Sequence, residues 1–439
     1  MEPPALLRSV VQAALAAVEP GAAIRRALAV RRGALTVGGL LLPLRAFRRV
    51  LIVGAGKAAA PMAAAVADLV AERPVEGLVI VPHGYRAPTG PVALREAGHP
   101  LPDEAGLRAT AELIELLAGA NEDDLVIATL SGGASALLVA PAGDLTLEDV
   151  GVTTELLLRS GATIAEVNAV RKRLDRIKGG RLVRVAFPAL TLGLVISDVV
   201  GSPLDVIASG PTVPDRSSWE EAAAVIARYQ LTERLPPRVR AWLEAGYAGQ
   251  LDPPLGPDDP VFTRAKTVIV ADNRLAARSA ARAAEEAGLA SLVLTTFVEG
   301  EAREVGRVLA GVLREVDASG LPLRRPCCLV AGGETTVTVR GPGLGGRNQE
   351  VALGAALALA GVPRVLFAAI GTDGRDGPTD VAGAWVDGET VARGRAHGQE
   401  AAAALAANDS YHFFAAAGGH LRTGPTLTNV NDLYLLFAC

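Results

Sequence analysis

Short apolar runs alternate with longer amphipathic or alanine-rich segments through the first half of the chain. The runs with the length and composition of buried strands are Arg49–Val53, Gly77–Val81, Leu125–Leu130 and Leu190–Ile196. Helices are expected between them, over residues 58–70, 107–118 and 163–178. Strands that alternate with helices predict a parallel, doubly wound sheet, so the expected fold class is α/β.

The same alternation resumes after a segment rich in proline, glycine and aspartate, between about Leu235 and Pro260. Because proline lacks a backbone N–H, this density of prolines is expected to end regular structure and to mark a domain boundary. The predicted domains are therefore residues 1–240 and 260–439. In the second domain we expect strands at 267–271, 292–295, 327–330, 336–339 and 365–370, and helices at 275–287, 301–319 and 349–360.

Composition narrows the possible functions. The chain has 439 residues and a net charge of −4, without a basic tail, so nothing favours nucleic acid or an anionic membrane as a partner. No long uncharged apolar stretch predicts a membrane-spanning helix, and the N-terminus lacks the pattern of a signal peptide. Three cysteines cannot form a disulfide framework, which fits a cytoplasmic protein, and five scattered histidines do not suggest a zinc site.

The first motif with chemical meaning is Gly54-Ala55-Gly56-Lys57, where a predicted strand meets a helix. Glycines permit a tight turn, and a helix N-terminus offers free N–H groups to an anion. The letters also fit the dinucleotide pattern G-x-G-x-x-A, but no carboxylate ends the second strand, which reads Val81-Pro82-His83. A purely structural turn is the alternative; Lys57, one of only four lysines among 43 basic residues, favours phosphate binding.

Three further features of the first half could bind a ligand. The sequence Ser131-Gly132-Gly133-Ala134-Ser135 predicts a second strand-to-helix nest for phosphate or carboxylate oxygens, with a nucleophilic serine as the rival reading. On the next helix, a polar face forms either a solvated surface or a positive wall for an acidic substrate; its members are Asn168, Arg171, Lys172 and Asp175. After a further strand come Ser197-Asp198 and Ser209-Gly210, where the carboxylate of Asp198 could bind magnesium or accept a proton.

The second half holds a denser cluster. Glu334 follows a predicted strand, and the glycine-rich segment ending at Gly346 leads into Arg347 and Asn348 at the start of a helix. A guanidinium beside a helix N-terminus is expected to bind an anion strongly. The glycine loop that follows the last of these predicted strands carries three carboxylates, Asp373, Asp376 and Asp380, which could coordinate a hard cation or simply form turns.

Together these motifs resemble the bacterial and archaeal glycerate 2-kinases. The resemblance runs in order from about residue 50 to the end of the chain, and the second half resembles the C-terminal domain called MOFRL. The motifs that carry it include Gly54–Ala58, Leu130–Ala136, Asn168–Lys172, Ser197–Val199, Ser209–Thr212, Gly332–Thr335, Gly345–Glu350, Gly371–Gly374 and Thr428–Leu433. Leu427 and Arg375 stand where this family usually has a glycine and an uncharged residue.

The resemblance implies a Rossmann-like first domain, a smaller second domain and an active site in the cleft between them. It implies transfer of the ATP γ-phosphoryl group to the 2-hydroxyl of D-glycerate with Mg²⁺, and Lys57 and Arg347 as catalytic cations. Asp198 or Asp373 would then hold magnesium or accept the hydroxyl proton, and the remaining candidates would grip the nucleotide or substrate. Two rivals stay open: an NAD(P)-dependent hydroxypyruvate reductase and a non-catalytic nucleotide sensor. A homodimer is also possible.

Overall fold

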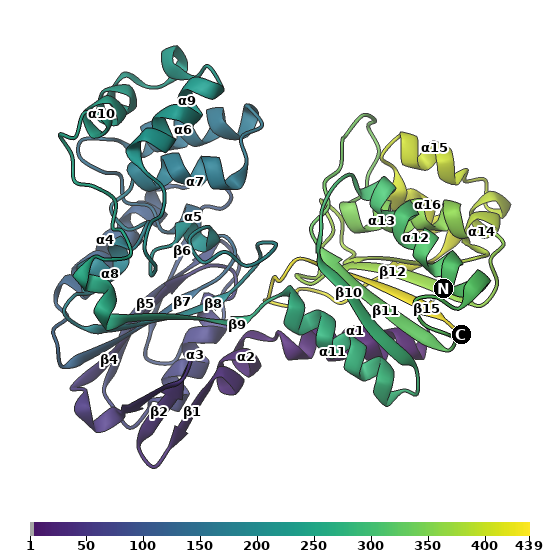
Figure 1. Cartoon of the computed structure of the whole chain (residues 1–439), viewed down its shortest axis with the longest axis horizontal. Helices are drawn as coiled ribbons and strands as arrows, with labels where there is room; N and C mark the ends of the chain where they lie inside the picture. The colour runs from purple at the N-terminus through teal and green to yellow at the C-terminus, as the bar shows by residue number, and fades with distance from the viewer. Residues whose placement is uncertain (1–3) are drawn as a thin grey trace. The chain divides into compact units, whose positions relative to one another are not determined.

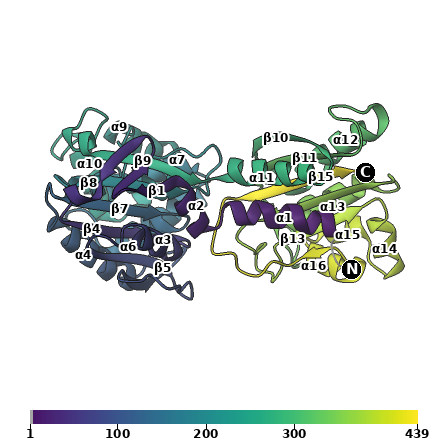
Figure 2. The same ribbon diagram turned by 90° about the horizontal axis from the view of Figure 1, so that it is seen from below.

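The computed structural model describes residues 4–439, which form two compact units. The front unit comprises Ala23–Ser197 and Ser202–Val270, and the rear unit comprises residues 4–22, Asp198–Gly201 and Ala271–Cys439. The boundary predicted between residues 240 and 260 stays a prediction. In the structure the last part of the front unit ends at Val270, and the chain then enters the rear unit at Ala271. The N-terminal helix α1 (Ala5–Ala17) belongs to the rear unit, where it packs beside α11 (Asn273–Glu286) (Figure 2).

The front unit contains the expected doubly wound sheet. Its strand order is β6-β5-β4-β7-β8-β9, and each neighbouring pair from β6 to β8 is parallel. The strands are β4 (Arg49–Ala55), β5 (Val75–Pro82), β6 (Ala93–Ala97), β7 (Asp124–Leu130), β8 (Leu190–Ile196) and β9 (Ala265–Ala271). Every residue of β7 is buried, as a strand covered on both faces requires. The predicted fold class is confirmed here.

Helices cover both faces of this sheet (Figure 1). α3 (Ala59–Leu69) packs on β4, β5 and β7, while α4 (Glu104–Ala118) and α8 (Arg181–Ala186) contact each other on the opposite face. Further helices form their own apolar cluster around Leu157, Trp219 and Leu243. Those helices are α6 (Leu147–Arg159), α7 (Ile164–Arg173), α9 (Trp219–Arg228) and α10 (Pro237–Tyr247). A three-stranded antiparallel sheet completes the unit, made of β1 (Leu28–Arg31), β2 (Ala34–Val37) and β3 (Leu40–Pro43).

The rear unit contains a mixed sheet of order β10-β11-β15-β12-β13-β14, in which β10 and β11 run parallel and the other neighbouring pairs within residues 4–439 are antiparallel. Its strands are β10 (Ala290–Val298), β11 (Cys327–Gly333), β12 (Val365–Gly371), β13 (Gly383–Asp387), β14 (His420–Leu421) and β15 (Asp432–Ala438). The C-terminal strand β15 lies between β11 and β12, antiparallel to both, and all seven of its residues are buried.

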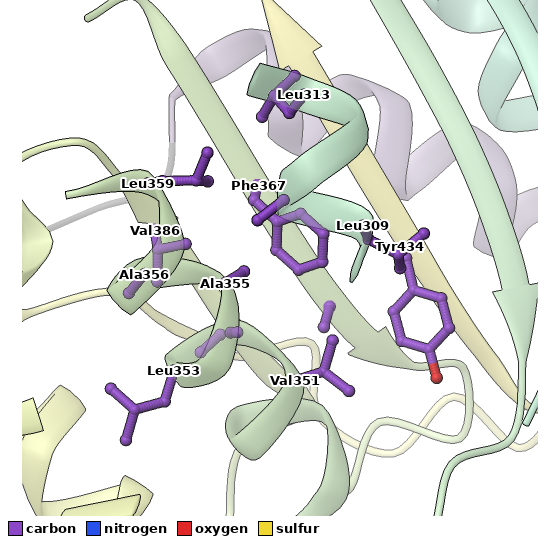
Figure 3. Close-up of a cluster of buried hydrophobic side chains, with 14 of the residues drawn as sticks. Leu309, Leu313, Val351, Leu353, Ala355, Ala356, Leu359, Phe367, Val386 and Tyr434 are labelled. Carbon is purple, nitrogen blue, oxygen red and sulfur yellow. The ribbon is translucent and has the colours of Figure 1, made fainter. Parts of the chain in front are cut away.

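Helices cover the two faces of this sheet unequally (Figure 1). One face bears α1 and α11, and the other bears α12 to α16. The latter are α12 (Ala302–Ser319), α13 (Arg347–Leu359), α14 (Thr390–Ala396), α15 (Ala401–Ala406) and α16 (Ser410–Ala417). Figure 3 shows the core beneath them, where Phe367 and Tyr434 from the sheet meet Leu309 and Leu313 of α12 and Val351 of α13. This packing fixes the start of α13, which carries Arg347.

The remaining elements are short. They are the helices α2 (Pro20–Ala27) and α5 (Ala134–Leu137) and the 3₁₀ turns Leu44–Ala46, Ile207–Ser209, Thr232–Arg234 and Pro260–Arg264. No helix within residues 4–439 combines the length and apolar character needed to span a membrane.

Three local expectations were wrong. The proline-rich segment contains α10, because Pro237 occupies the first helical turn, where a missing N–H costs nothing. The strand expected at 336–339 is absent: Thr336 forms one isolated bridge, and the amide of Thr338 donates to the carboxylate of Glu301 instead of to a neighbouring strand. The helix expected over 163–178 ends at Arg173, since the Asp175 carboxylate accepts from the amides of Ala140 and Ile177.

Candidate active site

Two glycine-rich loops lie side by side at the carboxyl ends of β4 and β7 in the front unit. The amide of Lys57 donates to the carbonyl of Gly132 at 2.9 Å, and the amide of Ala58 donates to the Ser131 hydroxyl at 3.0 Å. The amide of Ser131 in turn donates to the carbonyl of Ala55. The sequence predicted these loops separately, and the structure joins them into one layer at the sheet edge where parallel folds bind ligands.

Gly54 and Gly56 are required by this close approach. Gly56 has φ +127°, and a Cβ atom there would lie 2.6 Å from the backbone oxygen of Ser131 and still closer to its hydroxyl. A Cβ at Gly54 would similarly collide with the backbone of Thr129. Only glycine fits these positions, so close packing against β7 and the second loop by itself requires these glycines, and phosphate binding there stays a prediction.

A second group of predicted residues converges behind the Ser131–Ser135 loop. The hydroxyls of Ser135 and Ser209 lie 2.9 Å apart, and Ser209 donates to the Asn168 side-chain oxygen at 3.0 Å. The Arg171 guanidinium donates to the Ser135 carbonyl at 3.3 Å. The φ angle of +62° at Gly210 lets the chain turn after Ser209, which is fully buried. The structure therefore brings four of the predicted binding residues together in one hydrogen-bonded cluster, namely Ser135, Asn168, Arg171 and Ser209.

The polar face of α7 is not solvated, contrary to one of the two readings of the sequence. Asn168 and Lys172 are buried, with exposed fractions of 2% and 3%. The Lys172 ammonium lies 3.2 Å from the fully buried Asp215 carboxylate, which also pairs with Arg173. Arg173 and Lys172 outweigh the effect of burial and hold the pKa of Asp215 below its usual range. Lys172 thus already has a strong partner, and its part in ligand binding stays a prediction.

Sequence reasoning overlooked His99. A Cβ at Gly133, whose φ is +90°, would lie 2.9 Å from the His99 ring, so the ring rests against the second loop. Loss of hydration and the positive charge of Lys57 lower the pKa of His99, which keeps the imidazole neutral at pH 7. In the sequence, the feature that could have pointed to His99 is its position two residues after β6, at the carboxyl end of that strand.

In the rear unit, Arg347 stands between two carboxylates. It lies 2.7 Å from Asp432, whose side chain is fully buried, and it also pairs with the half-exposed Glu334. Burial opposes the charge on Arg347, but Asp432 and Glu334 outweigh that effect and raise its pKa, so the guanidinium is permanently charged. Burial also raises the pKa of Asp432 to about 7, despite the neighbouring guanidinium.

The topology explains why these groups meet. Asp432 opens β15 and pairs in register with Gly333 at the end of β11 and with Gly371 at the end of β12. Glu334 and Thr372 therefore begin the loops on either side of Asp432. The side chain of Asn348 donates to Asp432 at 3.0 Å. Asn348 is buried, so its side chain holds the Asp432 carboxylate in position and is not exposed to solvent.

The start of α13 is already capped from within the protein. The Asp376 carboxylate accepts from the backbone amides of Asn348 at 2.9 Å and Gln349 at 2.8 Å. Gly346 is needed here, because a Cβ would collide with the Asp376 side chain. The sequence suggested that these helical N–H groups bind a ligand anion, but Asp376 occupies the amides of Asn348 and Gln349, so the Arg347 side chain, which is 32% exposed, is the candidate that remains at this helix start.

The carboxylates of the 371–380 loop have separate roles. Asp376 caps α13, and Asp380 accepts a hydrogen bond from the Tyr411 hydroxyl. Asp373 is half-buried, and its carboxylate accepts from the amide of Arg375 at 3.0 Å. Among residues 4–439 no group of three or more His, Cys, Asp or Glu side chains is arranged to hold a metal ion. The expectation that these three carboxylates form a cation site together is therefore not met.

Comparison with known proteins identifies the family. Residues 6–244 match the family described as a domain of unknown function, DUF4147, and residues 327–432 match the MOFRL family. A D-glycerate 2-kinase from Thermotoga maritima is 41% identical over 396 residues, which cover 90% of this chain and 92% of the relative. The chain belongs to the glycerate kinase family of the MOFRL type.

Other relatives of this glycerate kinase family member agree in architecture, though not always in name. A crystal structure of glycerate kinase from Thermotoga maritima superposes with a TM-score of 0.88 at 38% identity and covers 99% of each chain. A relative from Agrobacterium vitis, 42% identical over 98% of this chain and 93% of its own length, carries the provisional name hydroxypyruvate reductase. The family resemblance inferred from the motifs is thus confirmed, including its C-terminal MOFRL domain.

Proposed function

We propose that this protein transfers the γ-phosphoryl group of ATP to the 2-hydroxyl of D-glycerate and releases ADP and 2-phosphoglycerate. The observation that carries the proposal is the paired glycine layer, with Lys57 at its edge, in a chain whose relatives are named glycerate kinases. Phosphoryl transfer needs alignment and neutralisation of diffuse negative charge more than covalent help from the protein. We also propose that the protein is cytoplasmic and forms a homodimer.

The front unit supplies a suitable bed for phosphate. The amides of Lys57, Ala58 and Ser131 already bond between the two loops, so the backbone N–H groups that we assign to phosphate oxygens are those of the Gly132–Ser135 segment. Lys57 adds a compact charge at that place, and the hydroxyls of Ser131 and Ser135 line the same loop. We assign nucleotide or substrate oxygens to Lys57 and the second loop, and the carboxylate of glycerate to the neighbourhood of Arg171.

The rear unit supplies the second cation. Arg347 keeps its charge through the buried Asp432, and its other partner, Glu334, is half-exposed and can be displaced. A guanidinium held in this way can contact the transferring phosphoryl group as charge builds up on its equatorial oxygens. The proposal assigns both Lys57 and Arg347 to phosphoryl transfer.

The carboxylates present fit a magnesium ion that arrives with the nucleotide. Mg²⁺ in kinases is held by one or two carboxylates together with phosphate oxygens, so a preformed protein cage is not required. We assign one of two carboxylates to it as the oxygen donor, either Asp373, half-buried beside Thr372, or Asp198, two residues after β8. Bound there, the ion would neutralise charge on the phosphates. Whichever of the two carboxylates is not a ligand would accept the hydroxyl proton.

The test is product identification followed by substitution at both cations. Purified protein with D-glycerate, ATP and Mg²⁺ should form 2-phosphoglycerate, which an added enolase converts directly, whereas 3-phosphoglycerate requires a mutase first. Lys57→Ala should lower kcat by about 10²-fold or more, as expected for loss of a group that stabilises the transition state. Lys266→Ala, at an exposed lysine of β9, is the matched control and should retain full activity.

The same purified proteins also test the rival hypothesis of a hydroxypyruvate reductase. In the presence of NADH and hydroxypyruvate, absorbance of the nicotinamide should stay constant. Oxidation of NADH with no consumption of ATP would overturn the kinase proposal, and an undiminished rate for Lys57→Ala would overturn the role of the lysine. Binding of ATP without turnover of any hydroxy acid would instead indicate a nucleotide sensor.

A further inference from the structure

The rear unit contains a cavity of about 720 Å³ whose lining includes neither Arg347 nor Asp432. It lies between α1 and the β12–β14 side of the mixed sheet, on the face that α1 and α11 cover (Figure 2). One wall is formed by α1, and the other by Ile370, the strand β14 and the loop that follows it. Its volume falls in the range of about 300–1,000 Å³ typical of small-molecule sites.

The lining of this cavity combines an apolar floor with positive charge. Leu7, Val11 and Leu15 project from successive turns of α1 and provide the apolar part. Arg8 and Arg422 provide two guanidinium groups, and within the part of the chain that the structure describes no lining residue carries a carboxylate. Such a combination suits an organic anion with an apolar body better than it suits a fully polar sugar phosphate.

Two side chains near the cavity, Asp380 and His420, affect how Arg422 and a ligand could interact there. Arg422 lies 3.5 Å from Asp380, but both side chains are more than half exposed, and an exposed pair at this distance is weak enough to yield to a ligand. His420 also lines the cavity, and its Nε2 atom is buried without a hydrogen-bond partner. Because this atom is shielded from solvent, it is the rest of the His420 side chain that contributes to the cavity wall.

The cavity wall is continuous with the loop assigned to magnesium. Thr426 lines the cavity, and its hydroxyl donates to the carbonyl of Thr372. The amide of Thr426 donates to the carbonyl of Asp373 at 3.4 Å. The same segment is strained at Leu427, a non-glycine residue with φ +58°. A ligand that moves the 422–427 segment therefore acts directly on Thr372 and Asp373.

We propose that this cavity is a binding site for a small amphipathic organic anion, separate from the phosphoryl-transfer residues, and that its occupant restrains the Thr372–Asp373 loop. The anionic group would contact Arg422 and Arg8, and the apolar body would lie against Leu7, Val11 and Leu15. The proposal goes beyond the kinase function and does not depend on it, because binding can be measured with neither ATP nor glycerate present.

The test uses 8-anilinonaphthalene-1-sulfonate, an aromatic anion that fluoresces when it leaves water. The full-length protein should bind one equivalent in a saturable manner, and Arg422→Gln should weaken binding about tenfold through loss of a charge-assisted contact. Val11→Trp should abolish binding by filling the cavity. Arg282→Gln on the exposed face of α11 and Val308→Trp on the exposed face of α12 are matched controls and should bind like the unaltered protein.

Three further readouts make the proposal falsifiable even if Val11→Trp does not fold. The uncharged N-phenyl-1-naphthylamine should bind about tenfold more weakly than the sulfonate. Saturating ATP with Mg²⁺ should leave sulfonate binding unchanged, and the bound probe should slow amide hydrogen exchange in residues 371–376. Equal binding by Arg422→Gln would overturn the site, displacement by ATP would overturn its separateness, and unchanged exchange would overturn its link to Asp373.

Discussion

Replacing Gly56 with alanine tests the close contact on which the paired glycine layer depends. A Cβ atom at this position would lie 2.6 Å from the backbone oxygen of Ser131, well inside van der Waals contact, and that oxygen belongs to a chain fixed by β7. The residue must also keep φ near +127°, which an L side chain rarely adopts. We expect about 1–2 kcal/mol from the backbone conformation and about 1–3 kcal/mol from the overlap.

The matched control is Gly84→Ala in the same unit. Gly84 has φ +83°, but a Cβ there meets no heavy atom within 4 Å, so only the conformational cost of about 1–2 kcal/mol should remain. The free energy of unfolding of each variant is measured by urea titration, followed by a signal from the front unit. Gly56→Ala should also bind ATP more weakly by isothermal calorimetry, whereas Gly84→Ala should not.

The test is the difference between Gly56→Ala and Gly84→Ala in free energy of unfolding and in ATP affinity. Equal losses of stability would show that the two loops do not approach each other as closely as the structure indicates. Retained ATP affinity in a destabilised Gly56→Ala protein would separate the layer from nucleotide binding. In that case the contact would be structural only, and the phosphate site would have to lie elsewhere in the front unit.

The remaining predictions concern buried charge and helix capping. Because its folded pKa of about 7 lies above the ordinary value of 3.8, Asp432 should make the free energy of unfolding fall by about 4 kcal/mol as pH rises from 4 to 7, and Asp432→Asn should remove that slope in urea titrations. Asp215→Asn should cost about 3–5 kcal/mol in the same assay, because it leaves the buried charges of Lys172 and Arg173 without their acid. Thr163→Ala removes the capping box of α7 and should cost about 1 kcal/mol, whereas Thr163→Ser should cost less.

The front sheet was predictable because its strands are continuous apolar runs. Strands covered on both faces have few polar positions, and β4, β7 and β8 were all found from that feature alone. The carboxyl ends of β4 and β7 also carry the glycine motifs, so the candidate site could be placed on the sheet before its geometry was known. What the sequence could not provide was the contact between the motifs, since Gly56 and Ser131 are joined only by the parallel register of β4 and β7.

The rear sheet was harder to predict because its central strand comes last. β15 pairs with β11 and β12 over sequence separations that no local pattern reveals, and it reverses the direction expected from strand–helix alternation. Asp432 therefore looked like an ordinary residue of a terminal motif, although it is the buried acid that fixes Arg347. The role of Asp376 was hidden for the same reason, because it caps α13 through the amide of Asn348, which lies 28 residues earlier in the chain.

The two carboxylates beside Arg347 differ in a way that bears on phosphoryl transfer. Asp432 has a fully buried side chain, so removing the guanidinium would leave its charge without compensation, and the pair is held together. Glu334 is 42% exposed, and water can replace the guanidinium at little cost. An arriving phosphate would therefore displace Glu334 and leave Asp432 in place. The same arginine would then keep its position through one acid while exchanging the other for substrate, so its orientation would be set before the nucleotide binds.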